Sequence, residues 1–347
     1  MQIRNKLSEH EYKMIEEGFW KGRIDSDNNY DAFRWHQWIE RIDINDVDAL
    51  QADFVYGVGL IGFCSDLGVE RNKGRVGTAK GPDSIRKELM NRPCAFQQGM
   101  KIYDFGNLYP ADDSLEKIQA NLKWSVDRIL SLGLFPIVLG GGHAVALGTY
   151  LGIREYLDLN KSNTHLGIIN FDAHFDIRPY NDGVGTSGTM FRQIADYCQE
   201  KDSDFNYLCL GVQKSGNTVD LFKTAHRLGV EYILAKDMET SDLWGLTEKI
   251  DSFSKKNEAL YLTVCADVFS SAHAPGVSAP QPLGLYPEKV LKLIKYIIRT
   301  KKVLGFDIAE VSPRFDMDNT TASLAAIIIF TIVKTLAEEN GLEADYE

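Results

Sequence analysis

The sequence predicts an α/β protein: a single three-layer α/β/α domain around a mostly parallel sheet of about eight strands. Two observations lead to this prediction. From Phe54 onward, short apolar runs alternate with longer amphipathic runs of helical period. The apolar runs are almost uninterrupted, as expected for strands that helices cover on both faces.

The alternation places each element along the chain. The expected strands are 54–63, 102–105, 135–139, 166–171, 207–210, 231–234, 260–264 and 303–306. The amphipathic runs between them include 114–132, 144–157, 219–228, 243–253 and 287–298. Residues 1–50 are acidic and carry clustered aromatic side chains, so we expect an N-terminal extension packed on a domain formed by residues 51–347.

Composition narrows the class of protein. With 347 residues and 44% hydrophobic side chains, the chain can bury a large core. A net charge of −11 without a basic stripe disfavours nucleic acid as a partner. The longest apolar run, 325–333, is too short to cross a bilayer, and no secretory signal follows Met1. Five cysteines without a C-x-x-C pair fit a reduced, cytoplasmic protein.

One short stretch carries three metal-type ligands. Asp172, His174 and Asp176 follow the apolar strand 166–171 at positions i, i+2 and i+4, so extended backbone would place all three on one side. Carboxylates with an imidazole suit Mn(II), Zn(II), Co(II) or Ni(II). The alternative is a solvated acidic loop, which would repel itself unless a cation or an arginine neutralised it.

Three other expected strands also end on candidate ligands. These are His143 after 135–139, Cys265 and Asp267 after 260–264, and Asp307 and Glu310 after 303–306. In an open parallel sheet, ligands collect at the carboxyl ends of strands. Singly, the glycines before His143 fit a tight turn, and a lone histidine fits a satisfied interior residue. Together, the four strand ends indicate a two-metal hydrolytic site.

These segments resemble one enzyme family, the ureohydrolases, which include arginase, agmatinase and formimidoylglutamase. The resemblance covers most of the chain from about residue 54 to 326. Its motifs are Gly74-Arg75-x-Gly77-x3-Gly81-Pro82, Gly140-Gly141-Gly142-His143, Asp172-Ala173-His174-Phe175-Asp176, Asp267 with Ala274-Pro275-Gly276-Val277-Ser278-Ala279-Pro280, and Asp307-x-x-Glu310.

The resemblance implies an arginase-like fold, a homo-oligomer and two manganese ions. One ion would be held by His143, Asp172 and Asp176, and the second by Asp172, His174 and Asp267. A hydroxide bridging both ions would then attack the substrate. Glu310 would pair with the amidinium group of the substrate, and Asp176 would relay a proton.

Within the family, the details favour formimidoylglutamase. Gly142 stands where arginases and agmatinases usually have Asp, and the segment around Phe191 lacks the histidine of arginases. This implies hydrolysis of N-formimidoyl-L-glutamate to L-glutamate and formamide, a step of histidine degradation. The substrate carries two carboxylates, for which Arg178, Arg192 and Arg75 are the candidate partners.

Cys265 departs from the family pattern, since most ureohydrolases have a bridging Asp there. Two interpretations stay open: a bridging thiolate that shifts metal preference toward Zn(II) or Co(II), or a neutral thiol beside a singly occupied site. Rival functions are an agmatinase or guanidino-acid hydrolase, a mononuclear amide hydrolase of similar fold, and a degenerate, non-catalytic subunit for which Cys265 is the motivating feature.

Overall fold

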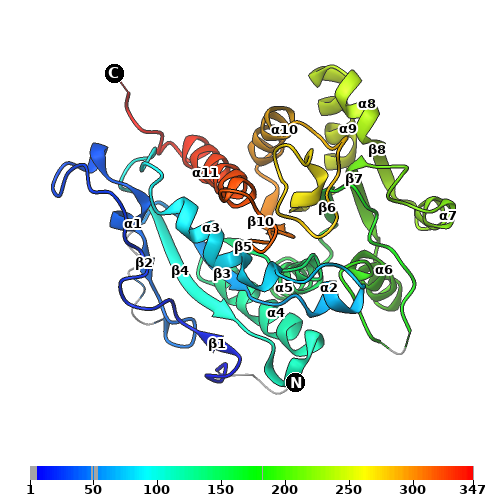
Figure 1. Cartoon of the computed structure of the whole chain (residues 1–347), viewed down its shortest axis with the longest axis horizontal. Coiled ribbons are helices and arrows are strands. Elements are labelled where there is room, and N and C mark those ends of the chain that lie inside the picture. The colour runs from blue at the N-terminus through cyan, green and yellow to red at the C-terminus, as the bar shows by residue number, and fades with distance from the viewer. Residues whose placement is uncertain (1–5, 48–49, 51–53, 182, 347) are drawn as a thin grey trace.

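The centre of the computed structural model, which describes residues 6–47, 50, 54–181 and 183–346, is one twisted sheet (Figure 1). Its eight main strands are all parallel, as predicted. In spatial order they are β4 (Met100–Leu108), β3 (Tyr56–Phe63), β5 (Phe135–Leu139), β10 (Val303–Ala309), β9 (Ala259–Cys265), β6 (Leu166–Phe171), β7 (Asn206–Val212) and β8 (Glu231–Leu234).

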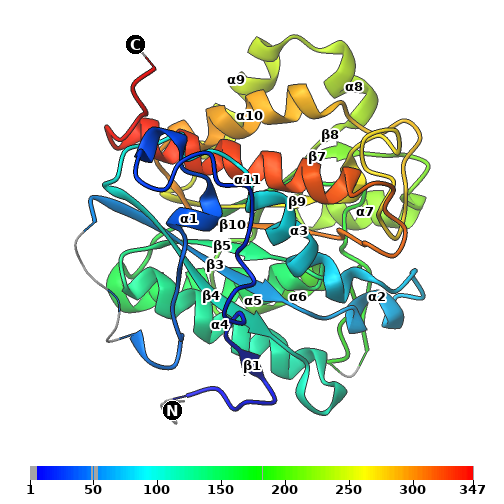
Figure 2. The ribbon, with the colours of Figure 1, turned by 60° about the vertical axis from the view of Figure 1, so that its left-hand side comes forward.

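Helices cover both faces of this sheet and bury two separate apolar cores. One face carries α4 (Leu115–Ser131), α5 (Val145–Asn160), α6 (Met190–Glu200) and α7 (Val219–Arg227). The other carries α3 (Gly81–Leu89), α8 (Ala235–Thr240), α9 (Leu243–Ser254), α10 (Pro287–Arg299) and α11 (Thr320–Glu339). Figure 2 shows α10 and α11 on one side of the sheet and α4 on the other, which confirms the three-layer prediction.

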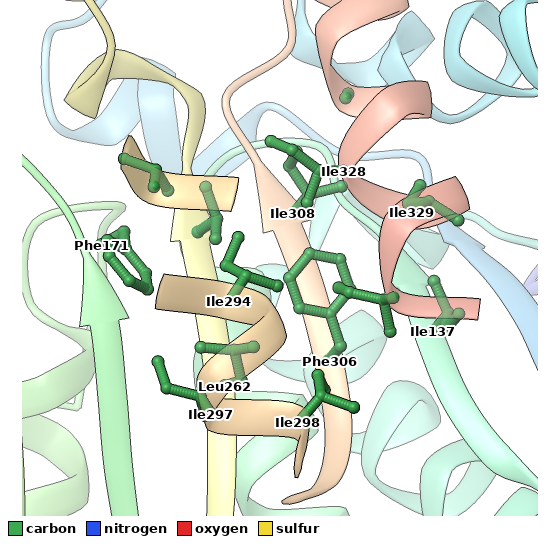
Figure 3. Packing of buried hydrophobic residues seen from close by; sticks show 14 of the residues in the cluster. Ile137, Phe171, Leu262, Ile294, Ile297, Ile298, Phe306, Ile308, Ile328 and Ile329 are labelled. Carbon is green, nitrogen blue, oxygen red and sulfur yellow. The ribbon is translucent and has the colours of Figure 1, made fainter. Parts of the chain in front are cut away.

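Isoleucines of two helices pack against one face of the central strands. Ile294 of α10 and Ile328 of α11 pack with Phe306 of β10 and Leu262 of β9 (Figure 3). All four side chains are fully buried. Helix α11 is apolar enough in composition and length to span a membrane, but 72% of its most apolar window is buried within the protein. The apolar side chains of α11 therefore form part of the protein core.

The N-terminal segment joins the sheet edge at β4. Strand β1 (Tyr12–Lys13) pairs with β4 in antiparallel orientation, and β2 (Glu40–Arg41) pairs with it in parallel. Helix α1 (Trp35–Trp38) places Trp35 in the core, and the indole N–H of Trp20 donates to Asp104 at 2.9 Å. The two short strands bring the described sheet to ten, against about eight expected. The division at residue 50 stays a prediction.

A second group of short helices shapes the loops around the strand ends. The α-helix α2 (Leu67–Arg71) follows β3 and precedes the Gly74–Gly77 segment. Within the described residues, the 3-10 helices are η1 (Tyr30–Ala32), η3 (Thr78–Lys80), η4 (Ala111–Asp113) and η5 (Ala266–Val268). Helix η5 is the one that turns the chain at the end of β9, directly after Cys265.

Candidate metal centre

The sequence-predicted ligands meet at the carboxyl ends of β5, β10, β9 and β6, which are neighbours in the sheet. A cavity of about 160 Å³ lies there, and part of its lining is His143, His174, Asp176, Cys265, Asp267 and Glu310. Asn72, Arg178, Ser187 and Ser278 also line it. The four strand ends therefore form one site, as the sequence indicates.

The Asp172 segment reaches the site by bending. Strand β6 ends at Phe171, and Asp176 has a φ of +50°, so the predicted extended geometry is wrong. Two hydrogen bonds hold the bend: the side chain of Asn217 accepts from the Phe175 N–H at 3.1 Å and donates to the Ala173 carbonyl at 2.9 Å. A non-glycine residue at positive φ is strained, and such strain often marks functional loops.

Two clusters of ligand atoms share Asp172. His143, Asp172 and Cys265 form the first, and Asp172, His174 and Asp267 form the second, with all ligand atoms of each cluster within 4.8 Å of one another. His143 Nδ1 lies 3.0 Å from Asp172 Oδ2 and 3.2 Å from Asp176 Oδ2. His174 Nδ1 lies 3.2 Å from Asp267 Oδ2. This is the arrangement of two adjacent ion sites with one common carboxylate.

The donor set fits divalent cations. His143 Nδ1 and Asp267 Oδ1 are buried without a hydrogen-bond partner. Across the part of the chain that the structure describes, no Lys or Arg lies within ion-pair distance of Asp172, Asp176 or Asp267, whose basic neighbours are histidines. Buried carboxylates need a cation or hydrogen-bond donors, and oxygen with imidazole ligands suits a transition ion such as Mn(II).

The pKa shifts point the same way. Burial would lower the pKa of His143 and His174, but the neighbouring carboxylates outweigh it and raise both values. Burial would raise the pKa of Asp172, but its contacts with the two histidines lower it. Burial and the charge of Asp172 raise the pKa of Asp176. The site thus favours positive charge, whether from protons or from a metal.

Cys265 ends β9 and is 1% exposed. Burial first, and then the nearby carboxylates, raise the pKa of its thiol. Its Sγ belongs to the first ligand cluster, beside His143 and Asp172. The sulfur is therefore close enough to bind a cation as a thiolate. The same position is compatible with a neutral thiol beside the metal site.

Glu310 follows β10 at a φ of +67° and lines the cavity together with His143. Its Oε1 accepts from the backbone N–H of His143 at 2.9 Å, while Oε2 is buried without a partner. Burial raises the pKa of Glu310 to about 8. Asp307 was expected to follow the strand as a candidate ligand, which is wrong. Strand β10 runs to Ala309, so Asp307 lies inside the sheet.

The three glycines before His143 pack closely against neighbouring segments. A Cβ on Gly140 would meet the Ile308 carbonyl at 2.5 Å, and one on Gly141 would meet the Ser65 carbonyl at 2.1 Å. A Cβ on Gly142 would meet Val69 at 2.5 Å. Gly140 and Gly141 leave no room for a side chain because their neighbours are backbone atoms, whereas at Gly142 the neighbour is the Val69 side chain, which can move.

The three candidate arginines lie in different surroundings. Arg178 lines the cavity and is exposed. Arg192 is ion-paired with Asp196 at 2.9 Å on α6 and is not among the lining residues. Arg75 donates to the Ser278 and Val277 carbonyls and stacks on Phe315 at 4.1 Å. The structure brings only Arg178 of the three together with the ligands.

Sequence reasoning missed several polar residues that support the ligands. Asn170 donates to Asp172 Oδ2 at 3.1 Å, and Thr263 contacts the ring of His143 at 3.1 Å. Asn217, in the loop after β7, accepts a hydrogen bond from the Phe175 N–H and so holds the segment that follows Asp172. A signal was present for two of them, since Asn170 and Thr263 are single polar residues in otherwise apolar strands.

Comparisons with known proteins agree with this geometry. The profile of the Arginase family matches residues 56–334. A formimidoylglutamase from Clostridium tetani is 54% identical over 331 residues, covering 95% of this chain and 98% of the relative. One from Geobacillus thermodenitrificans is 42% identical over 315 residues, covering 91% and 94%.

Solved structures show the same fold. The formimidoylglutamase of Bacillus subtilis has a TM-score of 0.76 at 24% identity, covering 91% of this chain and 96% of that one. The formiminoglutamase of Trypanosoma cruzi with Mn²⁺ has a TM-score of 0.72 at 23% identity, covering 85% and 97%. The fold, the ligand clusters and the extent of the family match lead to one conclusion: the chain belongs to the arginase family.

Proposed function

We propose that this protein hydrolyses N-formimidoyl-L-glutamate to L-glutamate and formamide. The observation that carries the proposal is 54% identity, over nearly the full length of both chains, to a formimidoylglutamase. The ligand clusters and the buried Glu310 supply the chemistry that such a reaction needs. The five free, buried cysteines and the family resemblance support a cytoplasmic homo-oligomer.

We infer that two divalent cations, Mn(II) by preference, occupy the site. His143, Asp172 and Asp176 would hold one, joined by Cys265 if its thiolate bridges, and Asp172, His174 and Asp267 would hold the other. Mn²⁺ accompanies the similarly folded Trypanosoma cruzi formiminoglutamase, and the mainly oxygen ligand set suits this ion. Divalent ions in such a site lower the pKa of water to near neutrality and so supply a nucleophile.

Glu310 binds and orients the formimino group. This group is a planar amidine whose protonated form matches a carboxylate in shape and charge. Glu310 Oε2 is buried and without a partner, while Oε1 is fixed by the His143 N–H. Burial raises the pKa of Glu310 to about 8, and an amidinium beside it favours the ionised carboxylate.

Asp176 holds the proton that hydrolysis must move. The new bond joins a water oxygen to the formimino carbon, and the bond that breaks joins this carbon to the glutamate nitrogen. One water proton must reach that nitrogen for glutamate to leave as an amine. Asp176 lines the cavity, and its Oδ2 lies 3.2 Å from His143 Nδ1, so its carboxylate is placed to accept a proton from water and return it.

Arg178 binds a substrate carboxylate. It is the candidate arginine that lines the cavity, and no ion pair engages its guanidinium among the described residues. Arg192 and Arg75 are weaker candidates, since Asp196 and the 277–278 carbonyls already engage them. A cationic substrate tail, as in agmatine, would be repelled by Arg178.

A substrate panel tests the assignment. The Mn(II)-loaded protein is assayed for hydrolysis of formiminoglutamate, agmatine, arginine and guanidino acids. We expect turnover of formiminoglutamate alone, with formamide and glutamate released in equal amounts. Turnover of only a cationic-tailed substrate would refute the proposal, and no turnover together with no bound metal would favour a non-catalytic subunit.

The variant Arg178→Gln tests the carboxylate partner. We expect its KM for formiminoglutamate to rise by about 10- to 100-fold, because a charge-assisted hydrogen bond contributes about 1.5–3 kcal/mol. The matched control is Arg192→Gln, whose arginine lies outside the cavity lining and should change KM little. Equal effects from both variants would contradict the role of Arg178.

A further inference from the structure

A buried carboxylate that the proposed reaction does not use lies inside the sheet next to the site. Asp307 of β10 is directly paired with Thr263 of β9, and both are fully buried. Tyr261, two residues earlier on β9, is fully buried as well. A carboxylate buried between central strands is costly unless its oxygens are hydrogen-bonded. Its contacts therefore indicate why it is there.

Both oxygens of Asp307 accept hydrogen bonds from hydroxyls. Thr263 Oγ1 donates to Oδ1 at 2.6 Å, and the Tyr261 hydroxyl donates to Oδ2. A threonine hydroxyl has one proton and two lone pairs. Because Thr263 gives its proton to Asp307, it can only accept from its other neighbour, which is His143 Nε2 at 3.1 Å.

This direction fixes the tautomer of His143. An Nε2–H that donates to Thr263 leaves Nδ1 with its lone pair free. Nδ1 is the ring atom that faces Asp172 Oδ2 at 3.0 Å and Asp176 Oδ2 at 3.2 Å, and it is buried without a hydrogen-bond partner. Three acceptors then converge where a cation would bind.

We propose that Thr263 and Asp307 are positioning residues, which hold His143 in its Nε2–H tautomer with Nδ1 directed at the metal. The inference rests on the proposed metal site. Two residues of the β10 segment then fix His143. Asp307 orients its ring through Thr263, and Glu310, just after the strand, accepts from its backbone N–H at 2.9 Å. Partners of this kind orient metal-bound histidines and raise their basicity.

The variant Thr263→Val tests the proposal, since it removes the hydroxyl and keeps the shape. We expect Mn(II) affinity at one of the two sites to fall by about 10- to 100-fold, as for other residues that support a metal ligand. Thr263→Ser, which keeps the hydroxyl, should restore most of the affinity. Equilibrium dialysis with metal analysis measures it, and the electron spin resonance signal of coupled Mn(II) pairs should weaken in Thr263→Val alone.

The matched control is Thr335→Val on α11. Thr335 is 1% exposed, and its hydroxyl donates to the Thr331 carbonyl at 2.8 Å, away from the ligands. We expect this variant to bind two Mn(II) like the wild-type protein. Wild-type Mn(II) affinity in folded Thr263→Val, or equal losses in Thr263→Val and Thr263→Ser, would overturn the proposal.

A measurement on the wild-type protein covers the case in which the variants fail to fold. His143 is the one buried histidine of the seven. In ¹⁵N spectra of protein loaded with diamagnetic Zn(II), we expect one histidine with Nε2–H in slow exchange with solvent and Nδ1 bound to metal. A buried ring protonated at Nδ1 would refute the inference. These readouts do not depend on turnover, so a failed substrate assignment would leave them informative.

Discussion

The protein buries acidic side chains in two regions, which differ in the partners that neutralise their charge. At the β4 edge, Asp104 receives two hydrogen bonds from fully buried Arg86, at 2.9 and 2.8 Å. It also accepts from the Gly106 N–H at 3.1 Å and the Trp20 indole at 2.9 Å. At the ends of β6 and β9, Asp172 and its neighbours have only histidines as basic partners among the described residues.

The difference separates a structural carboxylate from functional ones. Burial would lower the pKa of Arg86, but Asp104 outweighs it and raises that pKa, so the pair stays charged. Arg86 therefore neutralises Asp104 at the β4 edge, and no bound cation is required there. At the strand ends, no Lys or Arg among the described residues lies within ion-pair distance of Asp172, Asp176 or Asp267, and divalent ions would supply the missing positive charge.

The largest effect is expected for Asp172→Asn. Asp172 belongs to both ligand clusters, so its loss should weaken both ions and lower kcat/KM by about a thousandfold or more, equivalent to about 4 kcal/mol. The metal-free variant should lose less thermal stability than Asp104→Asn, because the partners of Asp172 are histidines, which can lose their proton, and not an arginine. Metal analysis, steady-state kinetics and calorimetry measure the three quantities.

The same change at the other carboxylate is its control. Asp104→Asn should lower the melting temperature, because it leaves the guanidinium of Arg86 without its counter-charge, and it should keep two Mn(II) per chain. If both variants lost stability alike, the distinction between the two regions would be lost.

Breaking the internal pair from the cationic side is the next effect in size. Arg86→Met leaves Asp104 buried and uncompensated, which should lower the free energy of unfolding by about 3–5 kcal/mol without changing Mn(II) stoichiometry. Arg71→Met is the matched control, since Arg71 and Glu116 form a partly exposed pair that should contribute about 0–1 kcal/mol. Denaturant titration compares the two variants, and a loss below that of the control would contradict a structural role for Arg86.

Much of the fold could be predicted from the sequence because its strands are short apolar runs. Strands 135–139, 166–171 and 231–234 have the expected bounds. Strand β10 extends three residues further than expected, since Asp307 looks like a strand end in the sequence. Its hydroxyl partners Tyr261 and Thr263 come from the neighbouring strand, and no local pattern reveals a cross-strand contact.

The site was predictable in its ligands and less so in its surroundings. His143, Asp172, His174 and Asp267 could be found because strand ends in a parallel sheet converge. The bend at Asp176 could not, since it depends on Asn217 from a later loop. For Arg192 a local signal exists: Asp196 lies four residues later on the same helix face. Whether Arg192 also binds substrate is what the Arg192→Gln control tests.

A smaller effect is expected for Trp20→Phe. The change removes one hydrogen bond to Asp104 and keeps most of the aromatic packing, so stability should fall by about 1–2 kcal/mol. Metal content and KM should not change, because Trp20 acts at the β4 edge. Denaturant unfolding measures the loss, and limited proteolysis of residues 6–47 shows whether the N-terminal segment has loosened. A variant as stable as the wild-type protein would mean that Arg86 satisfies Asp104 alone.

The smallest effect concerns Cys265, where the variant Cys265→Asp adds a carboxylate next to Asp172, which has no Lys or Arg partner among the described residues. If the thiol is a gap in the ligand set, the added oxygen ligand should raise Mn(II) affinity by about tenfold, or about 1.4 kcal/mol, and if the sulfur is already a ligand, Mn(II) affinity should not rise. The metal-free variant should be less stable than the wild-type protein, because another buried charge then faces Asp172. Parallel titrations with Mn(II) and Zn(II) separate the two interpretations of this position. A gain for Mn(II) with no loss for Zn(II) means that the thiol is a gap in the ligand set, whereas unchanged Mn(II) affinity with weaker Zn(II) binding means that the sulfur is itself a ligand.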